Sequence, residues 1–170
     1  MLLKPKNREN LATIIRSGQN LGVNTIFVIG GFIEEKYKGC IHKFSHQMNT
    51  QNGESNLTLL YFSELSEFLV HLPSQTTLVL VETFEAAQNL NNYVHPINAT
   101  YLFGRESTGI EKADLEMIEN FFNILNAEIP TQHLKNHKKT AHLHKIKIDT
   151  PQSLNLGVCA SIIMYDRQNK

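Results

Sequence analysis

The feature that most constrains this fold is the alternation of short apolar runs with segments of helical periodicity. Runs rich in β-branched, aliphatic and aromatic residues have the length of strands; they lie at residues 25–29, 57–62, 77–81 and 99–103. Helical segments separate most of these runs, as in βαβ units, where consecutive strands are parallel. The sequence therefore favours an α/β fold with a mostly parallel sheet and helices on both faces.

The segments between these runs supply the predicted helices. Asn10 precedes a helical pattern of apolar residues and Gly22 follows it, so we expect Asn10 to be the N-cap of a helix that stops at Gly22. The other predicted elements are helices at 64–71, 83–90 and 112–119, strands at 122–125 and 145–148, a loop-rich stretch at 34–55 and a final helix from Ser153. Because no repeat or linker divides the sequence, we expect one domain over residues 1–170.

The composition is that of a globular protein, with 41% hydrophobic and 19% charged residues. The two cysteines indicate no disulfide framework, and no apolar run approaches the roughly 20 residues that span a bilayer. The first residues lack the apolar stretch and the cleavage site of a secretory signal. We therefore expect a cytoplasmic protein with no membrane contact.

Positive charge is concentrated in one segment, although the formal net charge of the chain is zero. Between His133 and Lys147 the chain carries lysines and histidines and no acidic residue. A basic insertion at about 130–145 suits a polyanion, and a solvated lysine loop is the alternative interpretation. Its candidate phosphate-binding residues are Lys135, Lys138 and Lys139.

Common nucleotide-binding and hydrolase motifs are excluded. Residues 104–109 have the glycine spacing of a P-loop, but Ile110 and Glu111 follow where such a loop needs Lys and Ser or Thr. The sequence also lacks a G-x-G-x-x-G after an early strand and a G-x-S-x-G elbow.

Neither the histidines nor Cys159 have the sequence spacing of known metal sites. The histidines His133, His137, His142 and His144 lie among lysines, without the cysteines or carboxylates of zinc sites, so we expect no metal. Cys159 lies in the last predicted helix, where we expect a buried and inert thiol.

The segment from Ser153 to Arg167 joins a polar turn to a helix that begins with small residues. Gly157, Ala160 and Ser161 have little side-chain bulk, so another backbone can approach closely. An apolar stripe at helical spacing is expected to face the core; its members are Leu154, Val158, Ile162 and Tyr165.

Three blocks, in this order, resemble the signature blocks of the SpoU-type (TrmH-like) branch of the SPOUT methyltransferases. The first is Asn10, with Arg16 six residues on and then Gly-Val before a strand. The second, residues 101–110, is an apolar strand that ends in Gly-x-Glu and then Gly with an aliphatic residue. The third, residues 148–165, contains Ser-Leu-Asn and the small-residue helix. The resemblance covers nearly the whole chain, and the ordered set is specific.

The resemblance implies an S-adenosylmethionine-dependent RNA ribose 2′-O-methyltransferase. It also implies a C-terminal deep trefoil knot and a homodimer in which each active site draws on both subunits. The loops implied to hold the cofactor contain Glu82, Thr83, Gly104, Ile148, Ser153 and Leu154. The RNA substrate is expected to be transfer RNA rather than ribosomal RNA. The alternatives are a knotted RNA-binding or scaffold protein without catalysis, and an unrelated flavodoxin-like domain.

By resemblance, the catalytic residues are Arg16, Asn10, Glu106, Ser153 and Asn155. A guanidinium binds phosphate bidentately, so we expect Arg16 to position the RNA. Its acting as the base that accepts the hydroxyl proton is the less favoured hypothesis, because its pKa exceeds about 12. The structural alternatives are a surface arginine for Arg16, a helix cap for Asn10, and a cap of the following helix for Glu106.

The chain departs from the family pattern at two places. Asp149 follows Ile148 where the family has proline, and Pro151 is displaced two residues onward, which questions the geometry of this cofactor loop. The span between the second and third blocks is also longer than usual, and the excess is the Lys/His segment. We interpret that insertion as an RNA-contacting arm.

Overall fold

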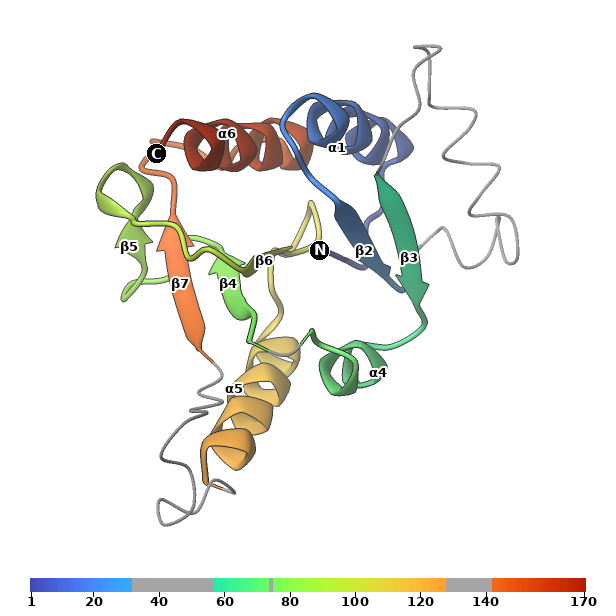
Figure 1. The fold of residues 1–170 in the computed structure, drawn as a ribbon, viewed down its shortest axis with the longest axis vertical. Helices are drawn as coiled ribbons and strands as arrows, with labels where there is room; N and C mark the ends of the chain where they lie inside the picture. Colours follow the sequence, from blue (N-terminus) through green and yellow to red (C-terminus); the bar gives the residue numbers. More distant parts are fainter. Residues whose placement is uncertain (32–56, 74, 128–141) are drawn as a thin grey trace.

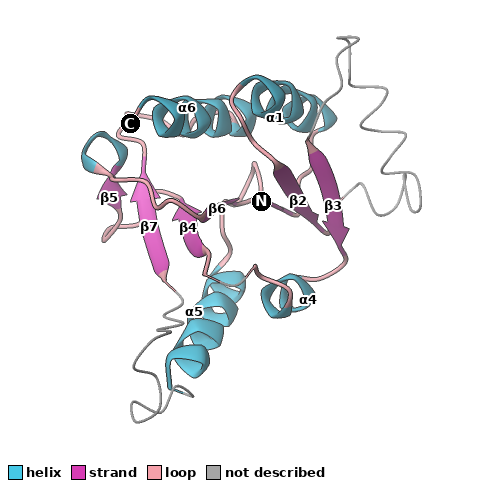
Figure 2. Cartoon of the chain, viewed as in Figure 1, coloured by secondary structure: helices cyan, strands magenta, loops and turns pink. Residues whose placement is uncertain are grey.

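The computed structural model describes residues 1–31, 57–73, 75–127 and 142–170. Its centre is a seven-stranded sheet in which all neighbouring strands are parallel (Figures 1 and 2). The strands are β1 (Leu2–Leu3), β2 (Thr25–Ile29), β3 (Thr58–Phe62), β4 (Thr77–Val81), β5 (Gln88–Asn89), β6 (Ala99–Phe103) and β7 (Leu143–Lys147). Their order is β3-β2-β1-β6-β4-β7-β5. The predicted parallel sheet is confirmed.

Helices cover both faces of the sheet, as expected (Figure 1). One face packs against α1 (Arg8–Asn20) and α6 (Leu156–Asn169), and the other against α4 (Leu65–Val70) and α5 (Lys112–Ala127). The alternation of side chains along a strand explains the two cores. In β4, Val79 faces the α1/α6 side and its neighbours Leu78 and Leu80 face the α4/α5 side.

The interior strand β1 was not predicted from the sequence. It is two residues long, too short to show any periodicity. It nevertheless pairs with β2 on one side and with β6 on the other, and Leu2 and Leu3 are almost completely buried. Its place in the sheet depends on neighbours that are distant in the sequence.

Two predicted elements are wrong. Residues 83–90 form turns and the short strand β5 instead of a helix, because Gln88 and Asn89 pair with β7; the 3₁₀ helix η1 (Leu90–Asn92) follows. Residues 122–125 are part of α5 instead of a strand, since Ile118 and Phe122, one helical turn apart, are both buried. Short apolar runs do not distinguish the two structures.

Other helices begin at residues different from those predicted. The helix α1 begins at Arg8 with Asn7 as its N-cap, so the N-cap prediction for Asn10 is wrong. The last helix begins at Leu156, with Asn155 as N-cap, instead of at Ser153. The helices predicted at 64–71 and 112–119 are present as α4 and α5.

The predicted basic insertion at about 130–145 is too long at its C-terminal end. Residues 143–145 lie in β7, and the Nδ1 atom of His144 lies 2.8 Å from the hydroxyl of Tyr93. Burial, and secondarily His142, lower the pKa of His144. The stretch 34–55 and the arm residues Lys135, Lys138 and Lys139 lie outside the described residues.

The predicted apolar stripe of α6 faces the core only in part: Ile162 packs against the core, whereas two other members are exposed. Val158 is 46% exposed and Tyr165 is 62% exposed. The buried side of the helix consists of Leu156, Gly157, Ala160 and Ile163. The predicted close approach does occur, however, and it is to α1.

Parallel helices α1 and α6 lie side by side (Figure 1). A Cβ at Gly157 would lie 3.1 Å from the side chain of Thr13, and the hydroxyls of Ser17 and Ser161 are 2.7 Å apart. These contacts, together with that between Asn10 and Asn155, bring the starts of both helices to the same end of the molecule.

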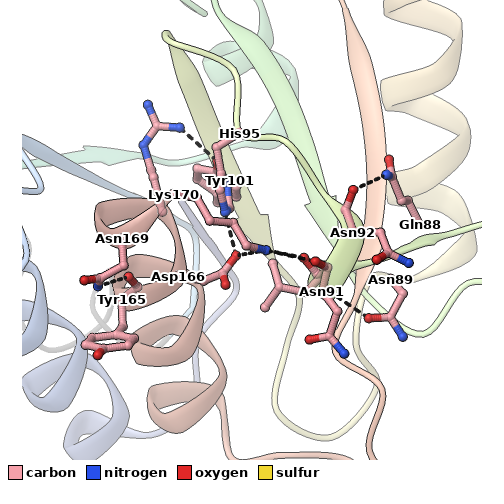
Figure 3. A network of polar contacts seen from close by, with 12 residues as sticks. Gln88, Asn89, Asn91, Asn92, His95, Tyr101, Tyr165, Asp166, Asn169 and Lys170 are labelled. Atoms are coloured by element: carbon pink, nitrogen blue, oxygen red, sulfur yellow. Dashed lines mark hydrogen bonds and ion pairs between the residues drawn. The ribbon is translucent and has the colours of Figure 1, made fainter.

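The C-terminal end of α6 is fastened to the loop before β6 by a polar network (Figure 3). His95 lies between the hydroxyl of Tyr101, at 2.7 Å, and the carboxylate of Asp166, at 2.8 Å. The Arg167 guanidinium donates to the carbonyls of Pro96 and Ile97, each at 2.7 Å. Lys170 donates to the Leu90 carbonyl and forms an ion pair with Asp166.

Among the described helices, none is both long and apolar enough to cross a bilayer.

Candidate functional site

Two adjoining pockets lie where α1 and α6 begin. The first, which we call the polar pocket, has a volume of about 760 Å³ and is lined by residues 6–10, Glu106 and residues 153–156. The second, which we call the loop pocket, has a volume of about 250 Å³ and lies at the ends of β4, β6 and β7. Both pockets are lined by Glu106, Ser153, Leu154 and Leu156. Groups bound in the two pockets would therefore be neighbours.

Glu106 joins the loop after β6 to the start of α1. Its Oε2 accepts the Lys6 backbone N–H at 2.9 Å, and its Oε1 accepts the Asn7 backbone N–H at 3.0 Å and the Asn10 amide at 3.1 Å. Partial burial favours the neutral acid, but these hydrogen bonds outweigh it and hold the pKa of Glu106 below its ordinary range. Glu106 thus contacts the start of α1, and the alternative interpretation, a cap of the following helix, is wrong.

The amides of Asn10 and Asn155 continue this network. An ionised carboxylate only accepts hydrogen bonds, so the Asn10 Nδ2 donates to Glu106 and its Oδ1 is left to accept from Asn155 Nδ2, at 2.8 Å. The Asn155 Oδ1 then accepts the backbone N–H groups of Gly157 and Val158, as an N-cap. The orientation of each amide is therefore fixed by the next group in the chain Glu106–Asn10–Asn155.

The loop 104–109 closes into a tight turn beside the end of β4. Arg105 and Gly109 exchange backbone hydrogen bonds of 2.9 and 2.8 Å. A Cβ at Gly104 would lie 2.1 Å from the Gly109 carbonyl carbon, and Gly109 has a φ of +65°, so both positions require glycine. The Glu82 carboxylate accepts the N–H of Ile110 at 3.2 Å and that of Thr83 at 2.9 Å. It fixes the loop to β4.

The lining of the loop pocket suits a cationic ligand that also carries a carboxylate. Its side chains include the Glu82 carboxylate, complementary to a sulfonium or ammonium group, and Arg105, whose buried Nε has no hydrogen-bond partner among the described residues. A carboxylate on the ligand is a suitable acceptor for such a donor. Burial, and secondarily the charge of Glu82, raise the pKa of Cys159 to about 11, so this thiol stays protonated near neutral pH. The donor set fits S-adenosylmethionine.

The structure places most of the predicted site residues in these pockets. Asn10, Glu106, Ser153 and Asn155 line the polar pocket. The loop pocket is lined by Glu82, Thr83, Gly104, Ile148, Ser153 and Leu154. Their roles remain predictions.

Arg16 lies elsewhere in the chain. It is exposed on α1 and is not among the residues that line either pocket in the described part of the chain. Six residues of helix rotate its side chain by roughly 240° from that of Asn10 and move it about 9 Å along the axis. Asp149, at the position of the family proline, is exposed and likewise lines neither pocket, whereas its neighbours Ile148 and Thr150 line the loop pocket.

Sequence reasoning missed the residues around the start of α1. Lys6, Asn7 and Arg8 line the polar pocket, and Asn7 caps α1 by accepting the Glu9 N–H at 2.8 Å. The available signal was a second capping residue three positions before Asn10, flanked by two basic residues.

Among the residues that the structure describes, no group of three metal-ligating side chains is found. His133 and His137 lie outside this part of the chain.

The model of the SpoU rRNA Methylase family matches residues 1–129. No curated protein matches the sequence. The SpoU methyltransferase AviRb from Streptomyces viridochromogenes is similar in structure, with a TM-score of 0.64 and 16% identity; the match covers 99% of this chain and 57% of AviRb, which has also been solved with AdoMet.

Two further solved structures are similar. One, described as giving insights into the 2-OH methylation of C/U34 on tRNA, has a TM-score of 0.63 and 16% identity, and the match covers 98% of this chain and 90% of that one. The other is an RNA 2′-O ribose methyltransferase with a TM-score of 0.57 and 20% identity, and the match covers 99% of this chain and 55% of that one. The chain thus spans just over half the length of AviRb and of the 2′-O ribose methyltransferase. At these identities the likeness shows a shared fold.

Proposed function

The chain belongs to the SpoU rRNA Methylase family, and we propose that it transfers a methyl group from S-adenosylmethionine to a ribose 2′-hydroxyl of RNA. The observation that carries this proposal is the shared wall of the two pockets. A cofactor in the loop pocket and a ribose in the polar pocket would meet at Glu106, Ser153 and Leu154. AdoMet-bound structures of the same fold support the choice of cofactor.

The residues of the chain contribute mainly by positioning. When bound, S-adenosylmethionine supplies an electrophilic methyl group on a sulfonium, and in-line approach of the hydroxyl is the requirement that the protein must meet. The loop pocket residues Glu82, Gly104 and Leu154 hold the donor side. The chain Glu106–Asn10–Asn155 fixes the wall of the acceptor side. Because its hydrogen bonds hold the pKa of Glu106 below its ordinary range, Glu106 is a weak base, and we assign it a positioning role and not that of the proton acceptor.

We assign Arg16 to the active site of a partner subunit in a homodimer. Its exposed position on α1, outside both pockets of its own subunit, supports this assignment. The exposed apolar side chains of Val158 and Tyr165 on the outer side of α6 are suited to an interface between subunits. In that arrangement Arg16 clamps a phosphate of the RNA bound by the partner.

Transfer RNA is the favoured substrate. The similar structure concerned with tRNA methylation is matched over 90% of its length, so its domain content is close to that of this chain. The arm that contains Lys135, Lys138 and Lys139 would then bind RNA by phosphate contacts, which are sensitive to salt. A deep trefoil knot through the segments around residues 104–109 and 148–156, and a cytoplasmic location, are further parts of the proposal.

The test combines cofactor titration with transfer of a tritiated methyl group to bulk tRNA and, separately, to bulk rRNA. We expect saturable S-adenosylmethionine binding and labelling of tRNA in ribose-methylated, alkali-resistant dinucleotides. Cofactor and RNA binding without transfer to either RNA would favour the alternative, a scaffold protein that has lost catalysis. An unrelated flavodoxin-like domain is already excluded by the family match.

A further inference from the structure

Lys6 lies at the junction of the two pockets. Its side chain belongs to the polar pocket, and its ammonium donates to the hydroxyl of Ser107, which lines the loop pocket, at 3.1 Å. Lys6 precedes the N-cap of α1, and Glu106 accepts its backbone N–H, so the backbone that carries this cation is fixed to the loop 104–109. Both residues are exposed, so a ligand can reach the ammonium.

The hydrogen bonds around Lys6 direct its ammonium, and not a carboxylate, toward a ligand at the junction. The charged side chains that line the polar pocket are Lys6, Arg8, Glu9 and Glu106. The Glu106 carboxylate keeps its charge but accepts hydrogen bonds from the backbone N–H groups of Lys6 and Asn7 and from the Asn10 amide, whereas the Lys6 ammonium donates to a neutral hydroxyl. An ammonium that donates to a neutral hydroxyl gains a stronger, charge-assisted hydrogen bond when a phosphate replaces that hydroxyl.

In RNA, the carbon next to the one that bears the reacting 2′-hydroxyl carries the 3′-phosphate. A ribose in the polar pocket, with its hydroxyl at the wall shared with the loop pocket, therefore brings a phosphate to the same junction. From this juxtaposition, and resting on the proposed function, we infer that Lys6 binds the 3′-phosphate of the target nucleotide. Lys6 thereby orients the ribose toward the methyl donor, a role separate from that of the arm at 130–145.

The experiment measures binding of bulk tRNA, from a strain that lacks this gene, over a range of salt concentrations. Loss of one phosphate contact decreases the slope of log Kd against log salt by about 0.7 to 0.9. We expect this decrease in Lys6→Ala, with affinity about tenfold weaker at low salt, and restoration by Lys6→Arg. The KM for tRNA in methyl transfer should rise, while the affinity for S-adenosylmethionine stays unchanged.

Two matched variants separate the inference from structural effects. Ser107→Ala removes the intramolecular partner of Lys6 but no charge, so it should keep the wild-type salt slope. Lys112→Ala removes an exposed lysine of α5, on the opposite face of the sheet, and should behave like the wild type. A wild-type slope in Lys6→Ala overturns the inference, and so does a loss of RNA affinity in Ser107→Ala equal to that in Lys6→Ala.

The salt slope also distinguishes this inference from the proposed function. If the wild type binds tRNA but transfers no methyl group, the proposed activity fails, and the slope of Lys6→Ala still decides whether Lys6 contacts phosphate. If transfer occurs and Lys6→Ala matches the wild type in KM and slope, the activity stands and the inference fails.

Discussion

Helix α6 is held at both ends, by neutral amides at its start and by ionic side chains at its end. At the start, Asn155 caps the helix and donates to Asn10. At the end, Asp166 and Arg167 bind His95 and the carbonyls of the loop before β6. Figure 3 shows the network at the C-terminal end of the helix.

The two ends also differ in what they leave accessible. The His95 side chain is 5% exposed, and both of its ring nitrogens have partners. Asn155 and Ser153 are exposed and line a pocket. The polar groups at the end of α6 therefore satisfy one another, whereas those at its start remain available to a ligand. We expect substitutions at the start to change activity and substitutions at the end to change stability.

The largest expected effect is on activity, from Arg16→Ala. Loss of the positioned guanidinium should reduce RNA methylation to background, a decrease on the order of 10²- to 10³-fold or more, with cofactor affinity nearly unchanged. Methyl transfer and S-adenosylmethionine titration measure the two quantities, and equal loss of both would contradict the assignment. Mixing Arg16→Ala subunits with Asn155→Ala subunits should restore part of the activity if the site is shared between subunits. Failure of this mixture, despite exchange of subunits, would place Arg16 outside the partner's site.

The next effect is on stability, at the other end of α6. Arg167→Ala leaves the carbonyls of Pro96 and Ile97 without their charged donor, and we expect a loss of about 2 kcal/mol in the free energy of unfolding. Denaturant unfolding measures this loss, and methyl transfer per folded molecule should not change. Lys112→Ala, which breaks an exposed ion pair, is the control and should cost less than about 0.5 kcal/mol. A large fall in the activity of folded Arg167→Ala would remove the contrast between the two ends.

Substitutions of Asn155 are expected to have a smaller effect on stability, and a separate effect on activity. Asn155→Ala removes the cap of α6 and should cost about 1 kcal/mol, whereas Asn155→Asp keeps a capping oxygen and should retain most of the stability. Both variants lose the donor to Asn10, so both should lose activity. Thermal unfolding and methyl transfer, measured together, separate capping from positioning. Full activity in Asn155→Asp would show that the amide chain is not needed.

The smallest expected effect is on how stability depends on pH. Burial alone would raise the pKa values of Glu106 and Asp166, but hydrogen bonds hold both below their ordinary values of 4.5 and 3.8. A carboxyl group with a depressed pKa in the folded state stabilises the protein above its ordinary pKa, and this contribution is lost as the pH falls through the depressed value. Glu106→Gln and Asp166→Asn should therefore be less stable than the wild type near pH 7, with the differences shrinking below about pH 4. Differences that do not change with pH would contradict this assignment of charge.

Much of the fold was predictable because it depends on local pattern. The strands at 25–29, 77–81 and 99–103 are continuous apolar runs, as expected for a sheet with both faces covered. The run at 122–125 misled because a short apolar segment fits a strand or a buried helix equally well. The sequence does not predict β1, because two residues are too few to show the periodicity of a strand.

The candidate site was predictable in its residue types and less so in its contacts. Asn10 was expected to cap a helix, and it is instead buried between Glu106 and Asn155. The N-cap is Asn7. The sequence could not distinguish the two asparagines, because both residues suit an N-cap and the choice depends on what each side chain faces. Lys6, one of the two basic residues beside Asn7, gave only a weak signal, since a lysine near a helix start is ordinary.

The sequence by itself determined the class of fold, the three separated blocks and the residue types that they carry, because local propensity and apolar period are properties of neighbouring residues. Only the tertiary structure decided that Glu106, Asn10 and Asn155 form one chain of hydrogen bonds, that Arg16 lies away from it, and that Lys6 meets Ser107 between two pockets. The contacts Asn10–Glu106, Asn10–Asn155 and Lys6–Ser107 each join residues about a hundred positions or more apart. Such pairing depends on how the parallel helices and strands pack.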